Sequence, residues 1–262
     1  MRNKLIAVVA LSGLLLFTDS VSAQNFAALQ QGAMTMTTKS KQAKQFTAMG
    51  LNHMINGEAA QAYQEFLSAV NADPNFTMPL VMLSFLSAGE TRKMYGKRAQ
   101  ESATNKSESE ILLASLAGEK MTNDSRIDVW GKLHTLNPND RVVGYIYANS
   151  RKTPEERFQA ALEYNLKYPE EPAMYNRLGY MYMNDKKDNE KAKASFEKYI
   201  QLYADGINPY DSMGDFYLAT GDTTNAEKYY NLALEKYPFF NNSINQLKKI
   251  AEMKKDKDQK KD

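Results

Sequence analysis

The stretch that decides the fold is residues 208–238, NPYDSMGDFYLATGDTTNAEKYYNLALEKYP. Two small residues, Gly214 and Ala226, stand twelve positions apart, and Tyr230 follows Ala226 by four. Small residues at this spacing would let two helices approach closely while the aromatic ring fills the space beside them. Pro238 would then stop the second helix, because proline cannot donate the next hydrogen bond. The stretch therefore predicts a helical hairpin.

The same spacing recurs elsewhere in the chain. The first hairpin repeats it with the following residues: Gly50, Ala62, Phe66 and Pro74. A G-x-x-Y unit begins at Gly144, Gly179 and Gly214, and so recurs every 35 residues. One such unit would carry no information, whereas three at one period indicate an array of similar hairpins. The tyrosine that ends each unit is predicted to be buried between helices: Tyr147, Tyr182 and Tyr217.

This arrangement resembles the tetratricopeptide repeat, whose pattern is W-x2-L-G-x2-Y, then A-x3-F and a final P. In the C-terminal stretch, Tyr210 stands for the tryptophan, Met213 for the leucine and Tyr230 for the phenylalanine. The resemblance implies an all-α fold, an α-solenoid of about six helical hairpins that forms a right-handed superhelix.

The array is predicted to cover residues 41–238, and the parts outside it have other characters. Residues 75–137 lack the G-x-x-Y unit and are interpreted as divergent repeats within the array. A capping helix over residues 239–253, with one apolar and one charged face, would cover the last hairpin. Residues 24–40 are expected to be a linker or a loosely docked helix, and residues 254–262 a charged disordered tail.

Residues 1–23 have the parts of a cleavable signal peptide. A basic start is followed by an apolar run over residues 5–17 and by the small residues of Val21-Ser22-Ala23. This order is typical of secretory signals, and Gln24 would then begin the mature chain. The alternative is an uncleaved membrane anchor, although a membrane span needs about 20 apolar residues.

Composition limits the classes of function. Lys and Arg number 33 against 31 Asp and Glu, so a formal net charge of +2 gives no general attraction to nucleic acid or to an anionic membrane. The chain has no cysteine, which excludes disulfides, thiolate catalysis and an acylated lipoprotein cysteine. Together with the signal peptide, these features predict a periplasmic or secreted bacterial protein that does not stay inserted in a membrane.

The family resemblance also implies a function. Tetratricopeptide arrays bind peptides or partner proteins on a concave side that is lined by the first helix of each hairpin. The groove positions of the family fall on nine residues of this sequence: Arg141, Tyr145, Asn149, Asn176, Arg177, Tyr180, Asn184, Asp211 and Asp215. Asparagine amides can both donate to and accept from a peptide backbone, and tyrosine offers apolar area with a polar tip.

A more specific version of this groove is not expected. Some members of the family clamp a C-terminal carboxylate with Lys, Asn and Arg across three successive first helices. Here the matching cations are Arg141 and Arg177, and two aspartates of the next unit oppose them. The mixed charge favours a partner segment that carries both polar and basic groups.

The sequence gives little support for catalysis. His53 is interpreted as a packed core residue, and His134 has no nearby acidic or histidine partner. Metal-ligand spacings, phosphate-binding glycine loops and nucleophile motifs are absent from the sequence. We therefore expect no catalytic residue, no metal and no cofactor, and a non-catalytic interaction or assembly scaffold in the cell envelope.

Two alternatives remain open. One is an envelope protein that binds a small molecule or glycan with Tyr145 and Tyr180 as stacking platforms. The other is a structural protein that self-assembles into a homo-oligomer through its terminal repeats. The sequence does not name the protein or peptide partner.

Overall fold

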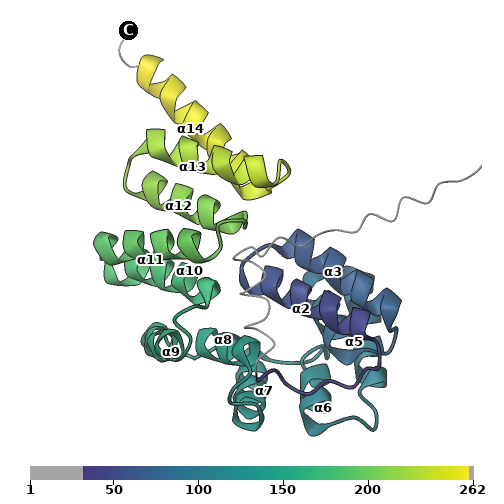
Figure 1. The fold of residues 1–262 in the computed structure, drawn as a ribbon. Helices are drawn as coiled ribbons and strands as arrows, with labels where there is room; N and C mark the ends of the chain where they lie inside the picture. The colour runs from purple at the N-terminus through teal and green to yellow at the C-terminus, as the bar shows by residue number, and fades with distance from the viewer. Residues whose placement is uncertain (1–31, 260–262) are drawn as a thin grey trace, which may run out of the picture.

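The computed structural model describes residues 32–259, and every regular element in that range is a helix (Figure 1). In chain order the elements are α2 (Lys41–Ile55), α3 (Ala59–Ala72), α4 (Thr77–Leu86), α5 (Gly89–Ser102), α6 (Glu108–Ser115), α7 (Asn123–Leu136), α8 (Arg141–Asn149), α9 (Pro154–Lys167), α10 (Pro172–Met181), the π-helix η1 (Tyr182–Lys186), α11 (Asn189–Leu202), α12 (Asn208–Ala219), α13 (Thr223–Lys236) and α14 (Asn241–Gln259). The predicted signal peptide, residues 1–23, lies outside the described residues. Within residues 32–259, none of the helices has the length and apolarity that a membrane span requires.

Many helices begin at a side chain that caps them. The capping residue accepts a hydrogen bond from the first turn in the following cases: Ser40, Ser107, Thr122, Asp140, Thr153, Asp188 and Asp222. At α9 the cap is reciprocal, because Glu156 also accepts from the backbone of Thr153, and Pro154 occupies the first turn. These local signals fix where the helices start and therefore where each hairpin turns.

A glycine of the first helix faces an aromatic ring of the second helix in most of the regular hairpins. A Cβ atom added to the glycine would lie 2.6 Å from that ring in three of them: Gly50 with Phe66, Gly179 with Phe196, and Gly214 with Tyr230. This close contact is the physical reason for the repeated spacing, and the all-α solenoid predicted from it is confirmed. The prediction was wrong for Tyr147, Tyr182 and Tyr217, which are only half-buried. The ring that fills the space between the helices comes from the second helix instead.

The two divergent hairpins, α4–α5 and α6–α7, share one hydrophobic core with α2, α3 and α8. Leu80 and Leu83 of α4 and Leu113 of α6 are fully buried in this core. Smaller apolar clusters follow, and each joins one hairpin to the next: α8–α9 to α10, α11 to α12, and α13 to α14. The C-terminal half is therefore held by a series of contacts between neighbours, whereas the N-terminal half shares one core.

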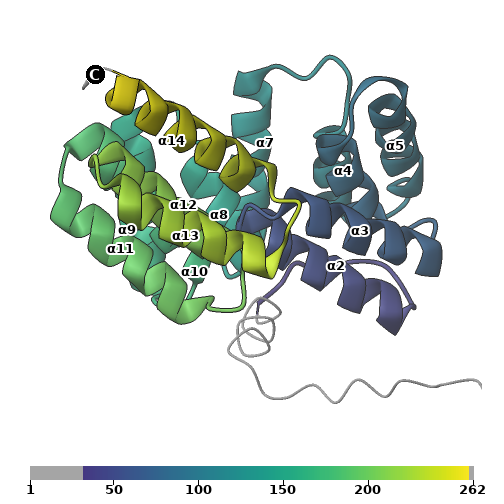
Figure 2. The same cartoon turned by 90° about the horizontal axis from the view of Figure 1, so that it is seen from above.

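The array bends so far that its first hairpin meets a later one. Figures 1 and 2 show α2 and α3 lying across from α10–α12. The Tyr199 hydroxyl of α11 donates to the backbone oxygen of Asn56, 143 positions earlier in the sequence, at 3.1 Å. Asn56 lies in the turn between α2 and α3, so that turn is docked on the junction between α11 and α12.

Two further segments complete the fold. Residues 32–40, the N-terminal segment, contain no helix and run from α8 to the start of α2. At the other end, α14 packs on α13 and buries Ile250 completely. The helix continues to Gln259, so residues 254–259 are helical where a disordered tail was predicted. Lysine is a good helix former, and Lys254 also pairs with Glu227 of α13 at 2.6 Å.

Candidate partner-binding surface

The predicted groove residues lie on the first helices of three successive hairpins, α8, α10 and α12, with Asn184 in η1. The structure joins several of them in pairs between neighbouring helices. Arg177 of α10 donates from its Nε to the side-chain oxygen of Asn149 on α8 at 2.7 Å. Asn149 in turn donates to the backbone oxygen of Tyr145 at 2.8 Å. The amide and the guanidinium thus fix each other in position.

A second pair joins α10 to α12. The Tyr180 hydroxyl donates to Asp215 at 2.7 Å, and the Tyr230 hydroxyl of α13 donates to the other oxygen of the same carboxylate at 2.7 Å. Burial and the negative charge of Asp215 raise the pKa of Tyr180, so the hydroxyl stays protonated and keeps donating. The ring of Tyr180 packs edge-on against Phe196 with centroids 5.1 Å apart. Both the hydroxyl and the ring of Tyr180 therefore contact other residues of the chain.

Asp211 holds the last helix. Its carboxylate is 3% exposed and accepts hydrogen bonds from Ser243 at 2.6 Å and from Asn242 at 2.7 Å, both of α14. Burial raises the pKa of Asp211 to about 6, while the hydrogen bond from Ser243 acts in the opposite direction. Since both oxygens are engaged inside the molecule, Asp211 contributes to the attachment of α14.

Arg141 is also engaged within the chain. It is 7% exposed, its Nη1 atom lies 2.5 Å from Glu170, and its guanidinium covers the ring of Tyr168 at 4.6 Å. The contact with Glu170 has the distance of an ion pair but not hydrogen-bond geometry. The backbone oxygen of Arg141 accepts from the Tyr164 hydroxyl at 3.0 Å. This side chain therefore ties the start of α8 to the end of α9.

The remaining predicted residues differ in accessibility. Burial raises the pKa of Tyr145 to about 12, and its ring packs edge-on against Tyr164 at 6.2 Å. Asn176 is buried, and none of the described residues donates to its side-chain oxygen. Asn184 is exposed, whereas Asn149 and Arg177 are half-buried. Tyr145, Tyr180 and Asp215 are also half-buried, so Asn184 is the one exposed side chain among the nine predicted residues.

Two buried carboxylates are not among the residues predicted to form the groove, although Glu171 stands out in the sequence as one of a pair of glutamates at a helix start. Glu171, at the start of α10, is 2% exposed, and burial raises its pKa to about 7. Within residues 32–259, no donor reaches its Oε1 atom. Glu58, at the start of α3, is 1% exposed and binds the α11–α12 junction. Neither glutamate belongs to a periodic pattern, so only its place next to a turn could have drawn attention to it.

The two histidines have structural contacts. His53 Nδ1 lies 2.7 Å from Glu58, at the edge of the α11–α12 junction. His134 stacks on Tyr147 with ring centroids 4.5 Å apart, and burial lowers its pKa. In the part of the chain that the structure describes, no three His, Cys, Asp or Glu side chains lie close enough to hold a metal ion.

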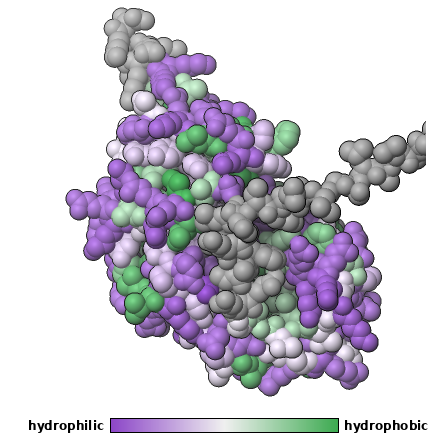
Figure 3. Space-filling view, viewed as in Figure 1, coloured by the Kyte–Doolittle hydropathy of each residue, from purple (hydrophilic) through white to green (hydrophobic). Residues whose placement is uncertain are grey.

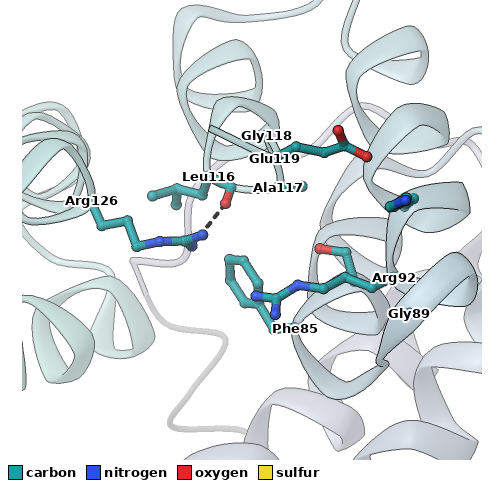
Figure 4. A pocket seen from close by; sticks show the side chains of 10 residues that line it. Phe85, Gly89, Arg92, Leu116, Ala117, Gly118, Glu119 and Arg126 are labelled. Atoms are coloured by element: carbon teal, nitrogen blue, oxygen red, sulfur yellow. Dashed lines mark hydrogen bonds between the residues drawn. The ribbon is translucent and has the colours of Figure 1, made fainter. Parts of the chain in front are cut away.

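A cavity of about 490 Å³ lies apart from the groove residues, between α4–α5 and α6–α7 (Figure 4). Phe85 and Arg92 line one side, and Arg126 reaches in from the other, where it donates to the backbone oxygen of Leu116 at 2.9 Å. Glu119 places a negative charge at the rim.

The face of the molecule in Figure 3 is mostly hydrophilic, with hydrophobic residues in separate spots.

Two of the hairpins match a known family of repeats. Residues 172–205 and 207–238 match the tetratricopeptide repeat model, and they correspond to the hairpins α10–α11 and α12–α13. These two hairpins are tetratricopeptide repeats. Arrays of this type are protein-interaction scaffolds.

The comparison with curated proteins gave no match. Among solved structures, PilW, a type IV pilus biogenesis factor, is 13% identical and matches 79% of this chain and 99% of its own at a TM-score of 0.47. TTC0263, a tetratricopeptide protein of Thermus thermophilus, is 13% identical over 80% and 98% of the two chains at a TM-score of 0.42. YrrB, described as having an unusual peptide-binding site, is 14% identical over 79% and 92% at a TM-score of 0.35. At these values, the functions of the three proteins are not transferred to this chain.

Proposed function

We propose that the protein is a non-catalytic scaffold of the cell envelope that holds a peptide or protein partner along α8, α10 and α12. The observation that carries the proposal is the pair formed by Arg177 and Asn149. These side chains hold each other in position at 2.7 Å and stay partly exposed. A polar group that is fixed before binding loses less conformational entropy when a partner arrives.

The chemistry of this pair suggests what it binds. Among the described residues, the hydrogen bond to Asn149 is made by the Nε of Arg177, and the two terminal amino groups make no further one. Two parallel N–H groups suit a carboxylate or a backbone carbonyl. Asn184, one turn beyond α10, adds an amide that can donate and accept. The partner segment is therefore expected to present oxygen acceptors to α10.

Several of the predicted groove residues already contact other parts of the chain. Asp211 and Asp215 accept hydrogen bonds from other parts of the chain, and Arg141 pairs with Glu170, so these side chains are already engaged. The rings of Tyr145 and Tyr180 pack on neighbouring rings, which weakens the alternative in which they stack on a small molecule or glycan.

Site-specific photo-crosslinking in cells tests the proposal. A photoreactive amino acid is placed at Asn184 or Arg177, and at Asn231 as a matched control, because Asn231 is an exposed asparagine of a second helix, α13. We expect one crosslinked protein at the first two positions and none at the control. Crosslinks of equal strength at all three positions, or at none, would contradict the assignment.

The envelope location has its own test. The export signal predicted over residues 1–23 supports it. N-terminal sequencing of the protein from cell-envelope and extracellular fractions should begin at Gln24. Recovery from the cytoplasmic fraction with Met1 intact would contradict this part of the proposal.

A further inference from the structure

The N-terminal segment, residues 32–40, is held like an extended peptide ligand. The backbone N–H of Met34 donates to Asp140 at 2.7 Å. Thr37 donates to Glu110 twice, from its N–H at 3.0 Å and from its hydroxyl at 2.7 Å. The segment thus crosses the N-terminal ends of α6 and α8, and two of its backbone donors point at carboxylates.

A third carboxylate, that of Asp73, also accepts a hydrogen bond from the N-terminal segment. The hydroxyl of Thr38 donates to Asp73 at 2.5 Å, at the end of α3. The three acceptors come from three different hairpins, and Glu110 and Asp140 are only 1% and 5% exposed. Two of the four bonds come from backbone N–H groups, which every residue except proline offers, and the other two favour a hydroxyl side chain at positions 37 and 38.

The apolar part of this contact is incomplete. Met34 is 4% exposed, yet a cavity of about 310 Å³ remains between the segment, α2 and α8. Met36 lines it from the segment, Ala48 and Leu51 from α2, and Val142 from α8. Methionine adapts well to irregular space, but here it leaves the volume open. A larger side chain at either methionine position would make contacts that the present segment lacks.

We propose that the cleft bounded by α2, α6 and α8 is a second peptide-binding surface, and that residues 33–38 occupy it as an internal ligand that a partner segment displaces. The partner segment is extended and carries an aromatic side chain in place of Met34 or Met36. It has no acidic residue at the positions of Thr37 and Thr38, because Glu110 and the neighbouring aspartate would repel one. This surface uses the ends of the helices and none of the residues on which the proposed function rests.

Fluorescence anisotropy with labelled peptides tests the inference on the chain from Gln24 onward. The first peptide has the sequence of residues 33–40, AMTMTTKS. The second replaces both methionines with phenylalanine, and the third also replaces the two adjacent threonines with glutamate. We expect the phenylalanine peptide to bind on the order of five- to tenfold more tightly than the first, and the acidic peptide to bind at least tenfold more weakly than the second. Equal affinities, or no binding of the phenylalanine peptide, would overturn the inference.

Variants locate the binding to the cleft. Ala48→Leu fills the cavity from α2 and should weaken the phenylalanine peptide at least tenfold, whereas Ala219→Leu, an exposed alanine of α12, should leave its affinity unchanged. Unchanged affinity of Ala48→Leu would overturn the assignment. If that variant does not fold, Met36→Phe in the full chain replaces it. By the same argument Met36→Phe should raise the melting temperature and slow proteolysis within residues 33–40, and a lower or unchanged value of either would count against the cleft.

Discussion

The tie between the first hairpin and the α11–α12 junction depends on Glu58, and replacing this residue gives the most direct test of the fold. Its carboxylate accepts from the Tyr203 hydroxyl at 2.9 Å and from the backbone N–H of Ile207 at 2.6 Å. A longer contact of 3.4 Å reaches the N–H of Asn208, and His53 lies 2.7 Å away. Because Glu58 is 1% exposed, water cannot replace these contacts without a local opening.

The size of the effect follows from the groups left behind. In Glu58→Ala, the Ile207 N–H and the Tyr203 hydroxyl lose their acceptor, and an unsatisfied buried group costs about 1–3 kcal/mol. We therefore expect a loss of about 3 kcal/mol in the free energy of unfolding. This loss corresponds to a fall in melting temperature of about 6–12 °C for a chain of this length. Glu58→Gln keeps one carbonyl oxygen and should lose about 1–2 kcal/mol, since a hydrogen bond to a neutral acceptor is weaker.

Urea unfolding followed by circular dichroism at 222 nm measures these losses. Glu101→Ala is the matched control, because Glu101 is an exposed helical glutamate whose nearest cation is 3.7 Å away. Small-angle scattering of Glu58→Ala should show a larger radius of gyration as α2 and α3 separate from α11 and α12. A loss within about 0.5 kcal/mol of the control, the range of ordinary surface substitutions, would refute the reasoning.

Three further predictions concern other parts of the chain. The pKa of Glu171 is raised to about 7, so ionisation of this side chain disfavours the folded state, and stability falls as pH rises from about 4.5 to 7. In Glu171→Gln the free energy of unfolding should therefore exceed that of the parent by about 1–3 kcal/mol at pH 8 but by little at pH 4. Urea unfolding at both pH values measures the difference. Ser243→Ala removes a donor to the buried Asp211 carboxylate and should lower the free energy of unfolding by about 1–3 kcal/mol. Amide hydrogen exchange should become faster in α14 than in the other helices, and an equal increase in all helices would contradict this. A Cβ atom at Gly214 would lie 2.6 Å from the buried Tyr230 ring, so Gly214→Ala should lower the free energy of unfolding by about 1–3 kcal/mol. At Gly131 the nearest atom would be 3.9 Å away, so Gly131→Ala should raise it by about 0.5–1 kcal/mol. Thermal melts of both variants measure these changes.

Local spacing was sufficient to predict the hairpins. Gly214 lies against the Tyr230 ring, and Ala226 is fully buried, as the spacing of the small and aromatic residues along the two helices predicts. The same reasoning misplaced the burial of Tyr217, since a spacing gives the helix face but not which of two neighbouring rings lies deeper.

Contacts between distant parts of the chain could not be predicted in this way. The bond between Glu58 and Ile207 spans 149 positions and depends on how far the array bends. The chain between these two residues includes the divergent hairpins, which carry no repeat signature. The candidate site shows the same limit. The family resemblance placed both Arg177 and Asn149 among the groove positions, but it predicted neither their hydrogen bond nor the contact of Asp211 with α14.

The docked turn has a consequence for how the chain folds during synthesis. In an open array each hairpin contacts only its neighbours, so the first ones can finish folding while later ones are still being made. Here the buried carboxylate at position 58 has His53 of its own hairpin beside it, but it lacks the donors of Tyr203 and Ile207 until the chain has grown to the start of α12. A newly made N-terminal half would therefore wait with an exposed polar turn, and its completion would depend on a contact of high sequence separation, the kind that slows folding.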